Sequence, residues 1–397
     1  MNFSINKFKN ELKNELINHI IPFWNSLRDN EYGGFYGYMD SDLTLDKNAD
    51  KGVILHSRIL WFYSTAYLKL GKAEYLENAH HAYDFLKYHC VDYEKGGVYW
   101  LMSYDGKPVD TMKHTYCQAF FVYALSAYYD ACKKKEALTL AMQIFSTIEE
   151  KAADKLSYME SFDRDWNVVE NDALSENGLN AVRTMNTILH LIEAYTELFR
   201  VSNDKKVSDR LEFLLQFTLD KIYDKNGKKL LVFFDDDMNV MGDIHSYGHD
   251  IEATWLMDIA CDILKNKELK EKVSNMNRNI VENIANIAFE NGSLNNEREN
   301  KKIDKSKIWW VQAEAVVGFA NGYSRYEDNR YLQVSGDIWN FIKNYVIDKR
   351  NGGEWHSRLD ENGVPDSSKP MVEAWKCPYH NGRMCLMLID NSILVNK

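Results

Sequence analysis

A short glycine-containing motif recurs at a fixed interval, and this repeat restricts the possible folds more than any other feature of the chain. The motif is Asp, three residues, Gly-Gly, one residue and an aromatic side chain, at 29–36, 92–99 and 348–355. Gly96 follows Gly33 by 63 residues, and Gly352 follows Gly96 by 256 residues, or four steps of 64. The missing steps fall near weaker turn sequences at 158–163, 226–227 and 291–292. Six units of about 60–65 residues therefore cover the chain, a period typical of repeat architectures.

Between the turns, apolar residues recur at three- and four-residue spacing without proline, which predicts helices. These segments are 55–70, 115–129, 184–199, 249–264 and 311–323, preceded by an amphipathic segment at 8–24. Each interval holds two helices and a hairpin-like loop. An open solenoid is one arrangement, but the first and last glycine turns match each other better than the middle ones. We expect an all-α fold, a closed (α/α)6 barrel of six helical hairpins with short β-hairpin-like loops at one end, forming a single domain over 1–397.

Composition excludes several partners. The net charge is −11 without a basic stripe, which argues against nucleic acid and anionic membranes. No apolar stretch approaches the length of about 18 residues that a membrane span needs. The N-terminus lacks the apolar core of a signal peptide, and the six cysteines form no CxxC pair, so we expect reduced thiols and a cytoplasmic protein. The aromatic content of 13% fits a large core or a carbohydrate site.

Polar residues on otherwise apolar helices are the candidates for chemistry. Asn186 and His190 share a helix face, as a catalytic pair or as a core histidine with its partner. In 243–255, His245 and His249 have metal-ligand spacing, but Gly248 suggests a turn between them. Glu252, one turn from His249, would orient the ring and raise its basicity, so we favour a catalytic pairing over a metal site.

Three further strings stand out. Trp310 and Glu314 lie on one helical face, as a stacking platform beside an acceptor or as a core contact. The segment 375–383 gathers Trp, Tyr, His, Asn and Arg around a proline turn, and such loops often carry function. Arg58 begins a strongly apolar helix and requires an anion, a polar ligand or a buried acid. Nucleotide-binding and serine-hydrolase motifs do not occur.

Taken together, four strings resemble the N-acylglucosamine 2-epimerase superfamily, and in particular its disaccharide branch. They are 51–61, 242–252, 309–314 and 375–383, and the resemblance extends over essentially the whole chain. It implies an (α/α)6 barrel that uses no cofactor and no metal. The implied reaction is epimerisation at C2 of the reducing-end glucose or mannose of a β-1,4-linked disaccharide, such as cellobiose to glucosyl-mannose or lactose to epilactose.

The resemblance also implies roles for particular residues. The acid/base histidines correspond to His249 and His380, with His190 as a third histidine, and Arg58 holds the oxygens near the reacting carbon. The implied substrate-binding residues are Tyr116, Asn186, Glu252, Trp309, Trp310, Glu314 and Trp375. We expect a monomer or weak homodimer acting on a small sugar with a free reducing end.

Three alternatives stay open at this point. An inverting glycoside hydrolase would need two carboxylates about 6.5–9.5 Å apart. An aldose-ketose isomerase of the mannose isomerase type would make a ketose, and a sugar-binding protein would bind without exchange at C2.

Overall fold

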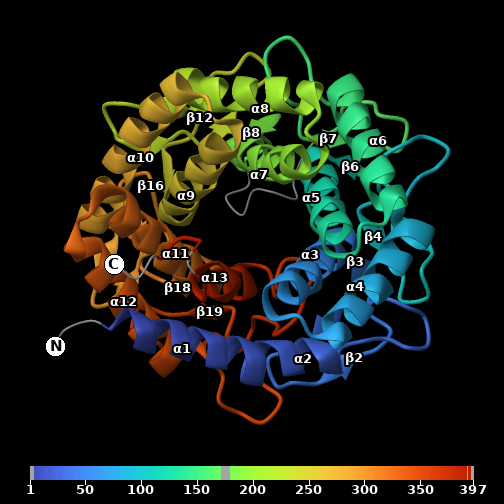
Figure 1. Cartoon of the computed structure of the whole chain (residues 1–397), viewed down its shortest axis with the longest axis horizontal. Coiled ribbons are helices and arrows are strands. Elements are labelled where there is room, and N and C mark those ends of the chain that lie inside the picture. Colours follow the sequence, from blue (N-terminus) through green and yellow to red (C-terminus); the bar gives the residue numbers. More distant parts are fainter. Residues whose placement is uncertain (1–3, 171–178, 391, 395–397) are drawn as a thin grey trace.

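The helices of the computed structural model form two concentric rings, which Figure 1 shows in projection. The structure describes residues 4–170, 179–390 and 392–394. The inner ring consists of α3 (Val53–Leu70), α5 (Thr115–Cys132), α7 (Met185–Ser202), α9 (Tyr247–Leu264), α11 (Trp309–Tyr326) and α13 (His380–Leu388). The outer ring consists of α1 (Ile5–Glu15), α2 (Ile21–Ser26), α4 (Ala73–Phe85), α6 (Lys135–Lys151), α8 (Lys205–Phe217), α10 (Lys267–Ile287) and α12 (Asn329–Phe341). Short π-helical turns continue four of the outer helices: η1 (Leu16–Ile20), η2 (Leu86–Cys90), η3 (Thr218–Ile222) and η4 (Ile342–Val346).

The ring is closed by pairing its two ends. Each inner helix contacts the next one, and α13 contacts both α11 and α3. The last inner helix also packs on the first outer helix, because α13 contacts α1 and η1. There the Lys9 ammonium donates to the carbonyl oxygens of Asp390 at 2.7 Å and Leu394 at 2.6 Å. The predicted closed barrel is therefore confirmed, and the open solenoid is excluded.

The predicted helices agree with the structure. The five predicted inner segments fall on α3, α5, α7, α9 and α11, which are each 18 residues long, and segment 8–24 falls on α1, η1 and α2. Each of these five inner helices ends at a residue in the left-handed conformation, followed at once by its outer partner. Only the first of these caps is a glycine, Gly71, so this second repeat is hidden in the sequence.

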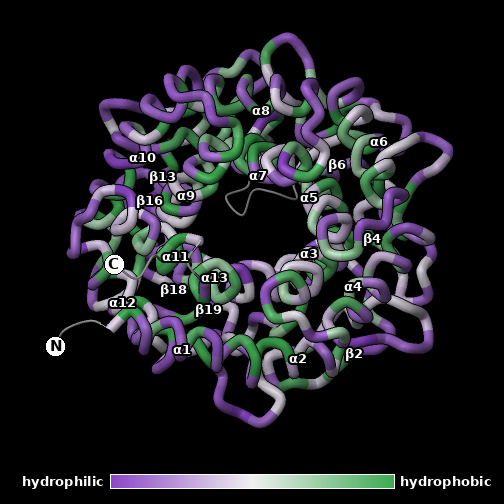
Figure 2. The backbone as a smooth tube through the Cα atoms, viewed as in Figure 1, coloured by the Kyte–Doolittle hydropathy of each residue, from purple (hydrophilic) through white to green (hydrophobic). Residues whose placement is uncertain are grey.

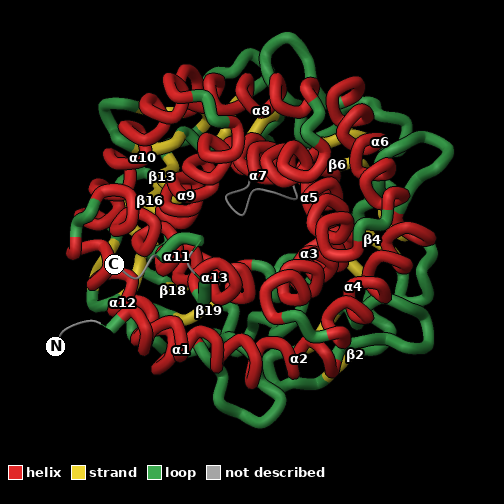
Figure 3. The backbone as a smooth tube through the Cα atoms, in the orientation of Figure 1, coloured by secondary structure: helices red, strands yellow, loops and turns green. Residues whose placement is uncertain are grey.

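Short antiparallel strands connect the outer helices to the inner ones, as Figure 3 shows. They are β1 (Tyr38–Met39), β2 (Leu45–Asp46), β3 (Lys51–Gly52), β4 (Leu101–Met102), β5 (Pro108–Asp110), β6 (Lys113–His114), β7 (Ser161–Phe162), β8 (Arg183–Thr184), β9 (Tyr223–Asp224), β10 (Lys229–Leu230), β11 (Phe233–Phe234), β12 (Val240–Met241), β13 (Ile244–Ser246), β14 (Phe289–Glu290), β15 (Ser293–Leu294), β16 (Glu297–Glu299), β17 (Lys302–Asp304), β18 (Lys307–Ile308) and β19 (Arg358–Leu359).

Five of the six predicted turns lie within tight antiparallel hairpins. The three Gly-Gly copies lie within the bridges Arg28–Phe35, Val91–Val98 and Ile347–Trp355, and the turns at 226–227 and 291–292 lie within β9–β10 and β14–β15. In the third unit the hairpin Ala153–Tyr158 turns just before the predicted 158–163, which instead contains β7. The motif aspartate holds the first of these turns together, because Asp29 Oδ1 accepts the backbone N–H of Glu31 and Tyr32. Its Oδ2 accepts Lys51 Nζ at 2.6 Å. Lys51 lies two residues before α3, so the turn fixes the start of an inner helix.

The hydrophobic core lies between the two rings. Inner helices are apolar around most of their circumference, whereas outer helices are apolar on one face, which Figure 2 shows by colour. The six cysteines are free, and all except half-buried Cys132 are buried. Among the described helices, none is long and apolar enough to cross a membrane.

Candidate active site

The repeat brings equivalent positions of the inner helices together around one axis. The sixth residue of α3, α7, α9 and α11 is Arg58, His190, Glu252 and Glu314 respectively. The other predicted site residues lie in the first turns of inner helices or just before α13: Tyr116, Asn186, His249, Trp309, Trp310, Trp375 and His380. The structure therefore gathers every predicted residue at the N-terminal end of the inner ring.

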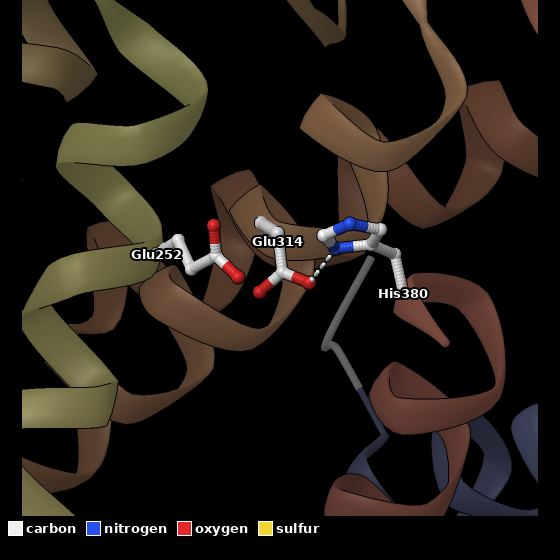
Figure 4. Close-up of side chains that lie close together, drawn as sticks. All are labelled: Glu252, Glu314 and His380. Atoms are coloured by element: carbon white, nitrogen blue, oxygen red, sulfur yellow. Dashed lines mark hydrogen bonds and ion pairs between the residues drawn. The ribbon is translucent and has the colours of Figure 1, made fainter. Parts of the chain in front are cut away.

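His380 is the first residue of α13 and is held by a carboxylate from α11. Its Nδ1 lies 2.7 Å from Glu314 Oε1 (Figure 4). The other oxygen of Glu314 accepts the indole N–H of Trp255 at 3.1 Å. Because an ionised carboxylate only accepts hydrogen bonds, this contact assigns the proton to Nδ1 and leaves Nε2 free to accept a proton.

His249 has a hydroxyl partner instead of a carboxylate. Its Nδ1 lies 2.7 Å from Ser246 Oγ, and its ring lies 4.8 Å from the Trp310 ring. The expected pairing of His249 with Glu252 is wrong, because Glu252 points to Arg383. A serine hydroxyl both donates and accepts, so it fits either tautomer of His249.

Gly248 lies inside α9, and its predicted turn is wrong. A Cβ at this position would come within 2.6 Å of the Trp310 ring. The glycine is required by the close packing of Trp310 on α9 rather than by a bend. His245 also has its own partner, Asp250 Oδ2 at 2.7 Å, and so does not pair with His249 as a metal ligand.

His190 is oriented by Glu193, one turn further along α7. The distance from His190 Nδ1 to Glu193 Oε2 is 2.9 Å, and the tyrosine hydroxyl of Tyr379 donates to the same carboxylate at 2.5–2.6 Å. Asn186, the partner that the sequence suggested, remains half-buried on the neighbouring turn. The contact with Glu193 rather than Asn186 therefore sets the orientation of His190.

A buried arginine from α13 joins the carboxylates beneath the histidines. Arg383 donates from Nη1 to Glu193, and from Nη2 to Glu252 and Glu314. Glu193, Tyr379 and Arg383 were not predicted as site residues, although the last two belong to the segment 375–383. Glu193 gave only the signal of a polar residue on an apolar helix, and the segment 375–383 did not reveal the partners of Tyr379 and Arg383.

This network gives its three carboxylates different pKa values. Although burial opposes it, the charge of Arg383 and hydrogen bonds from His190 and Tyr379 lower the pKa of Glu193 to about 2. Burial and the charge of Glu314 raise the pKa of Glu252 to about 7. Burial also raises the pKa of Glu314. The site therefore contains both an ionised carboxylate and a carboxyl that holds a proton near neutral pH.

Glu252, Glu314 and His380 place three potential metal-ligand atoms within 4.8 Å of one another. The guanidinium of Arg383 already donates to both carboxylates from Nη2, and Glu314 also accepts from His380. Because the Arg383 guanidinium already supplies the positive charge between these carboxylates, the cluster does not require a metal ion.

Arg58 differs from Arg383 in its surroundings. The Arg58 guanidinium donates to the Tyr116 hydroxyl at 2.8 Å and to the Trp375 carbonyl at 3.3 Å. It lies 4.2 Å from the Phe120 ring centroid and 4.8 Å from that of Tyr379. Within the described residues it forms no ion pair with a carboxylate, although it is only 2% exposed. A buried cation without a counter-ion is suited to an anion that forms during a reaction.

Aromatic rings lie among the polar groups of the site. The ring of Trp375 lies 5.6 Å from Trp100 and 5.8 Å from Tyr116. Trp309 lies behind His380 at 5.4 Å and is covered by the ammonium of Lys376. Trp100 was not predicted, because its position on a loop gives no helical periodicity. Half-buried Trp310 and Trp375 present indole surface to which a sugar ring can stack.

Several polar atoms of the site are buried without a hydrogen-bond partner in the described part of the chain. They are Arg58 Nε, Asn186 Oδ1 and Glu252 Oε2. Buried polar atoms normally have partners, so these atoms are suited to binding hydroxyl groups of a ligand.

Because His380 is buried, it makes the stability of the protein depend on pH. Burial and the charges of Arg383 and Arg58 lower the pKa of His380 well below its usual value. The folded state therefore keeps this ring neutral, whereas the unfolded chain takes up a proton below its ordinary pKa of about 6.5. Stability from this group is present above that pH and is lost as the pH falls.

We expect the parent protein to lose about 1.4 kcal/mol of unfolding free energy relative to the His380→Asn variant when the pH falls from 7.5 to 5.5. Urea unfolding followed by circular dichroism at several pH values measures this difference. A difference that stays constant over this range would contradict the neutral, buried ring.

Comparison with known proteins assigns the family. Residues 33–381 match the N-acylglucosamine 2-epimerase (GlcNAc 2-epimerase) family. A protein of Ruminococcus albus named cellobiose 2-epimerase is 57% identical over 383 residues, which cover 96% of this chain and 98% of that protein. The crystal structure of a sugar epimerase from a ruminal bacterium superposes with a TM-score of 0.97 at 56% identity, over 98% of this chain and 100% of that one.

A solved D-mannose isomerase superposes with a TM-score of 0.84 at 21% identity, over 98% of this chain and 99% of that one, and this likeness shows the fold alone. The resemblance predicted from the four sequence strings is thus confirmed. The chain belongs to the N-acylglucosamine 2-epimerase family and is a carbohydrate epimerase of the isomerase class.

Proposed function

We propose that the protein epimerises C2 of the reducing-end glucose or mannose of β-1,4-linked disaccharides, converting cellobiose to glucosyl-mannose and lactose to epilactose. One observation carries the proposal. His249 from α9 and His380 from α13 both contact the ring of Trp310, at 4.8 and 5.4 Å, and so border the same place from different helices. The Ruminococcus albus relative named for cellobiose supports the choice of substrate.

The reaction needs one proton removed from C2 and one returned to the opposite face. After the sugar ring opens, one histidine takes the C2 proton, and the C2–H electron pair forms the enediolate with C1. The other histidine then donates a proton to C2 from the other side. His380, with Nδ1 bound to Glu314, has a free Nε2 for this exchange, and His249 is free to adopt either tautomer. Each such group contributes on the order of 10²–10⁴ in rate.

Arg58 and His190 stabilise the oxyanion at C1 in this proposal. The Arg58 guanidinium has only neutral partners, so its charge is available to the enediolate. His190 lies beside Tyr116, with ring centroids 5.0 Å apart, and Tyr116 accepts from Arg58. Preorganised donors of this kind are often the largest single contribution to catalysis.

Replacing Arg58 with methionine is expected to lower kcat/KM for cellobiose by about 10²–10³-fold, because the charge that stabilises the enediolate is lost. The folded state is expected to lose little stability, since Arg58 has no ion-pair partner and methionine fits among the same aromatic rings. Steady-state kinetics and thermal unfolding of the Arg58→Met variant check both parts. An active variant would show that Arg58 only fills space.

The remaining predicted residues bind the sugar or support the histidines. We assign stacking contacts to Trp310 and Trp375, and hydroxyl contacts to Asn186 and Tyr116. Trp309 and Glu314 support His380, and Glu252 accepts from Arg383 at Oε1, which leaves Oε2 for a sugar hydroxyl.

Proton transfer alone accounts for the reaction, so we propose that no cofactor is needed. We also propose that the ring acts as one catalytic domain over 1–397, as a monomer or weak homodimer. The six free cysteines favour a cytoplasmic protein.

Hydrolysis is the less favoured function. An inverting hydrolase needs two carboxyl groups separated by room for a water molecule. Here the two candidates, Glu252 and Glu314, both accept from the same Nη2 of Arg383, which holds them together rather than apart. Isomerisation to a ketose shares the enediolate, and product analysis separates it from epimerisation.

Incubation with cellobiose in D₂O, followed by NMR of the reducing-end residue, tests the proposed function. Deuterium at C2 together with a mannose-type anomeric signal is the expected result. Free glucose would indicate hydrolysis, ketose signals would indicate isomerisation, and either as the sole product would overturn the proposal.

A further inference from the structure

We propose that Glu160 is a positioning residue for this reaction, which fixes the first turns of α5 and α7 and thereby the sugar-binding groups that they carry. The inference rests on the proposed function and adds a residue that none of the sequence strings contains. Glu160 lies in the loop before β7 and is 1% exposed.

Glu160 ties two inner helices together, through its carboxylate to α7 and through its backbone carbonyl to α5. Its Oε1 accepts the Thr187 hydroxyl at 2.7 Å, and its Oε2 accepts the Thr184 hydroxyl at 2.9 Å. Thr184 is the N-cap of α7, and its Oγ1 also accepts the backbone N–H of Thr187. The Glu160 backbone carbonyl accepts the N–H of Thr115 at 2.9 Å, which ties the same residue to the start of α5. The backbone N–H of the next residue, Tyr116, also favours the ionised carboxylate and lowers its pKa.

These two turns carry groups that face the proposed substrate. Tyr116 on α5 accepts from Arg58, and its ring touches His190 and Trp375. Asn186 lies between Thr184 and Thr187 on the first turn of α7, and its Oδ1 is buried without a partner in the described residues. A shift of either turn would therefore move the oxyanion contacts and the hydroxyl contacts together.

No charged side chain pairs with Glu160 in the described ranges. The cations on the neighbouring strands pair with other carboxylates: Lys113 on β6 binds Asp92, and Arg183 on β8 binds Asp154. His114 on β6 packs against Trp100, and His190 on α7 binds Glu193. Burial without a cation raises the pKa of Glu160 to about 7, against the hydrogen bonds from the two threonines. The ionised form accepts both threonine hydroxyls, whereas the protonated form must use one oxygen as a donor.

Glu160→Gln tests the inference, because the amide copies the shape of the protonated acid and cannot ionise. We measure kcat/KM for cellobiose from pH 5.5 to 8.5 in both proteins and take the ratio of variant to parent. The ratio is expected to lie near 1 below pH 6 and to fall about 10- to 100-fold above pH 8, where only the parent holds both turns. Groups that ionise in both proteins, Glu252 included, cancel in this ratio.

Glu149→Gln is the matched control. Glu149 also accepts two hydroxyl groups, from Tyr158 at 2.8 Å and Tyr195 at 2.7 Å, but it forms an ion pair with Arg210 at 2.5 Å and lies on the outer helix α6. Its ratio is expected to be independent of pH. A ratio for Glu160→Gln that is also independent of pH would overturn the inference and leave Glu160 a structural residue.

Two further measurements keep the test decisive. If Glu160→Gln does not fold, Thr187→Val is the second variant, because it removes one hydrogen-bond donor to the ionised Glu160 carboxylate. The pH at which kcat/KM rises is then expected to be higher in this variant than in the parent. An unchanged pH profile would overturn the inference. The second measurement is the affinity for cellobiitol, an open-chain analogue that cannot be epimerised, followed by tryptophan fluorescence. The ratio of variant to parent affinity is expected to depend on pH in the same way as the ratio of kcat/KM. A parent protein that binds cellobiitol but does not epimerise cellobiose would overturn the proposed function alone. A parent protein that neither binds cellobiitol nor epimerises cellobiose would overturn both proposals.

Discussion

Replacing His380 with asparagine is expected to lower kcat for cellobiose epimerisation by about 10²–10⁴-fold, the contribution of one well-placed acid/base group. The asparagine amide N–H replaces the Nδ1–H that contacts Glu314, so the hydrogen bond that supports the ring is retained. What is lost is the free Nε2 that exchanges the proton with C2. Steady-state kinetics of the purified variant, with circular dichroism to confirm folding, give the result.

His249→Asn is expected to cause a loss of the same size, because each turnover requires both histidines. His19→Asn is the matched control: His19 Nδ1 lies 2.7 Å from Glu15 Oε1, the same geometry as His380 with Glu314, but on the outer helix. We expect the control to retain full activity. Near-parent turnover in either site variant would show that the assignment of acid and base is wrong.

The second large effect is on stability, and it concerns Arg383. Replacing Arg383 with methionine leaves Glu193, Glu252 and Glu314 buried without their shared cation. Breaking a buried ion network from one side typically costs about 3–5 kcal/mol, because an uncompensated charge remains. We expect a loss of this order in the free energy of unfolding, measured by urea denaturation at pH 7.5.

Arg58→Met is the matched control for this prediction. The same substitution at a second buried arginine of the same site removes a cation that pairs with no carboxylate in the described residues. Arg58→Met is therefore expected to lose activity but little stability, whereas Arg383→Met loses both. Equal destabilisation of the two variants would contradict the division of roles between the arginines.

The fold could be predicted from the sequence to a large extent, because it is a repeat. The first glycine of each Gly-Gly copy has a positive φ, and the copies recur at a period that fits a pair of helices and a hairpin. The inner helices are buried on nearly all sides, so their apolar periodicity is strong. The left-handed caps that end five of them could not be predicted, since Lys133, Asn203, Lys265 and Glu327 take the place of glycine after the first unit.

The residues that gather at one end of the inner ring could be named from the sequence, but their hydrogen-bond partners could not. His249 and His380 lie in strings that resemble a family, and His190 stands out as a polar residue on an apolar helix. The hydrogen-bond partners of these histidines lie on other turns or other helices, among several polar groups of the same kind. Glu193 lies one turn after His190, as Glu252 lies one turn after His249, yet only the first pair forms. The difference arises because Arg383, from a helix far along the chain, binds Glu252. Spacing within one helix cannot reveal such a contact.

The central claim is that His249 and His380 act on C2 from opposite faces, and deuterium exchange in the two asparagine variants tests it most directly. Each variant is incubated in D₂O with cellobiose and, separately, with glucosyl-mannose, long enough for uncatalysed ring opening, and C2 is followed by NMR. The remaining histidine can still remove the proton on its own side. We predict that each variant exchanges C2–H of one epimer without inversion, and that the two variants choose opposite epimers. Loss of exchange from both epimers in one variant, with both retained in the other, would show a single-base mechanism and contradict the account.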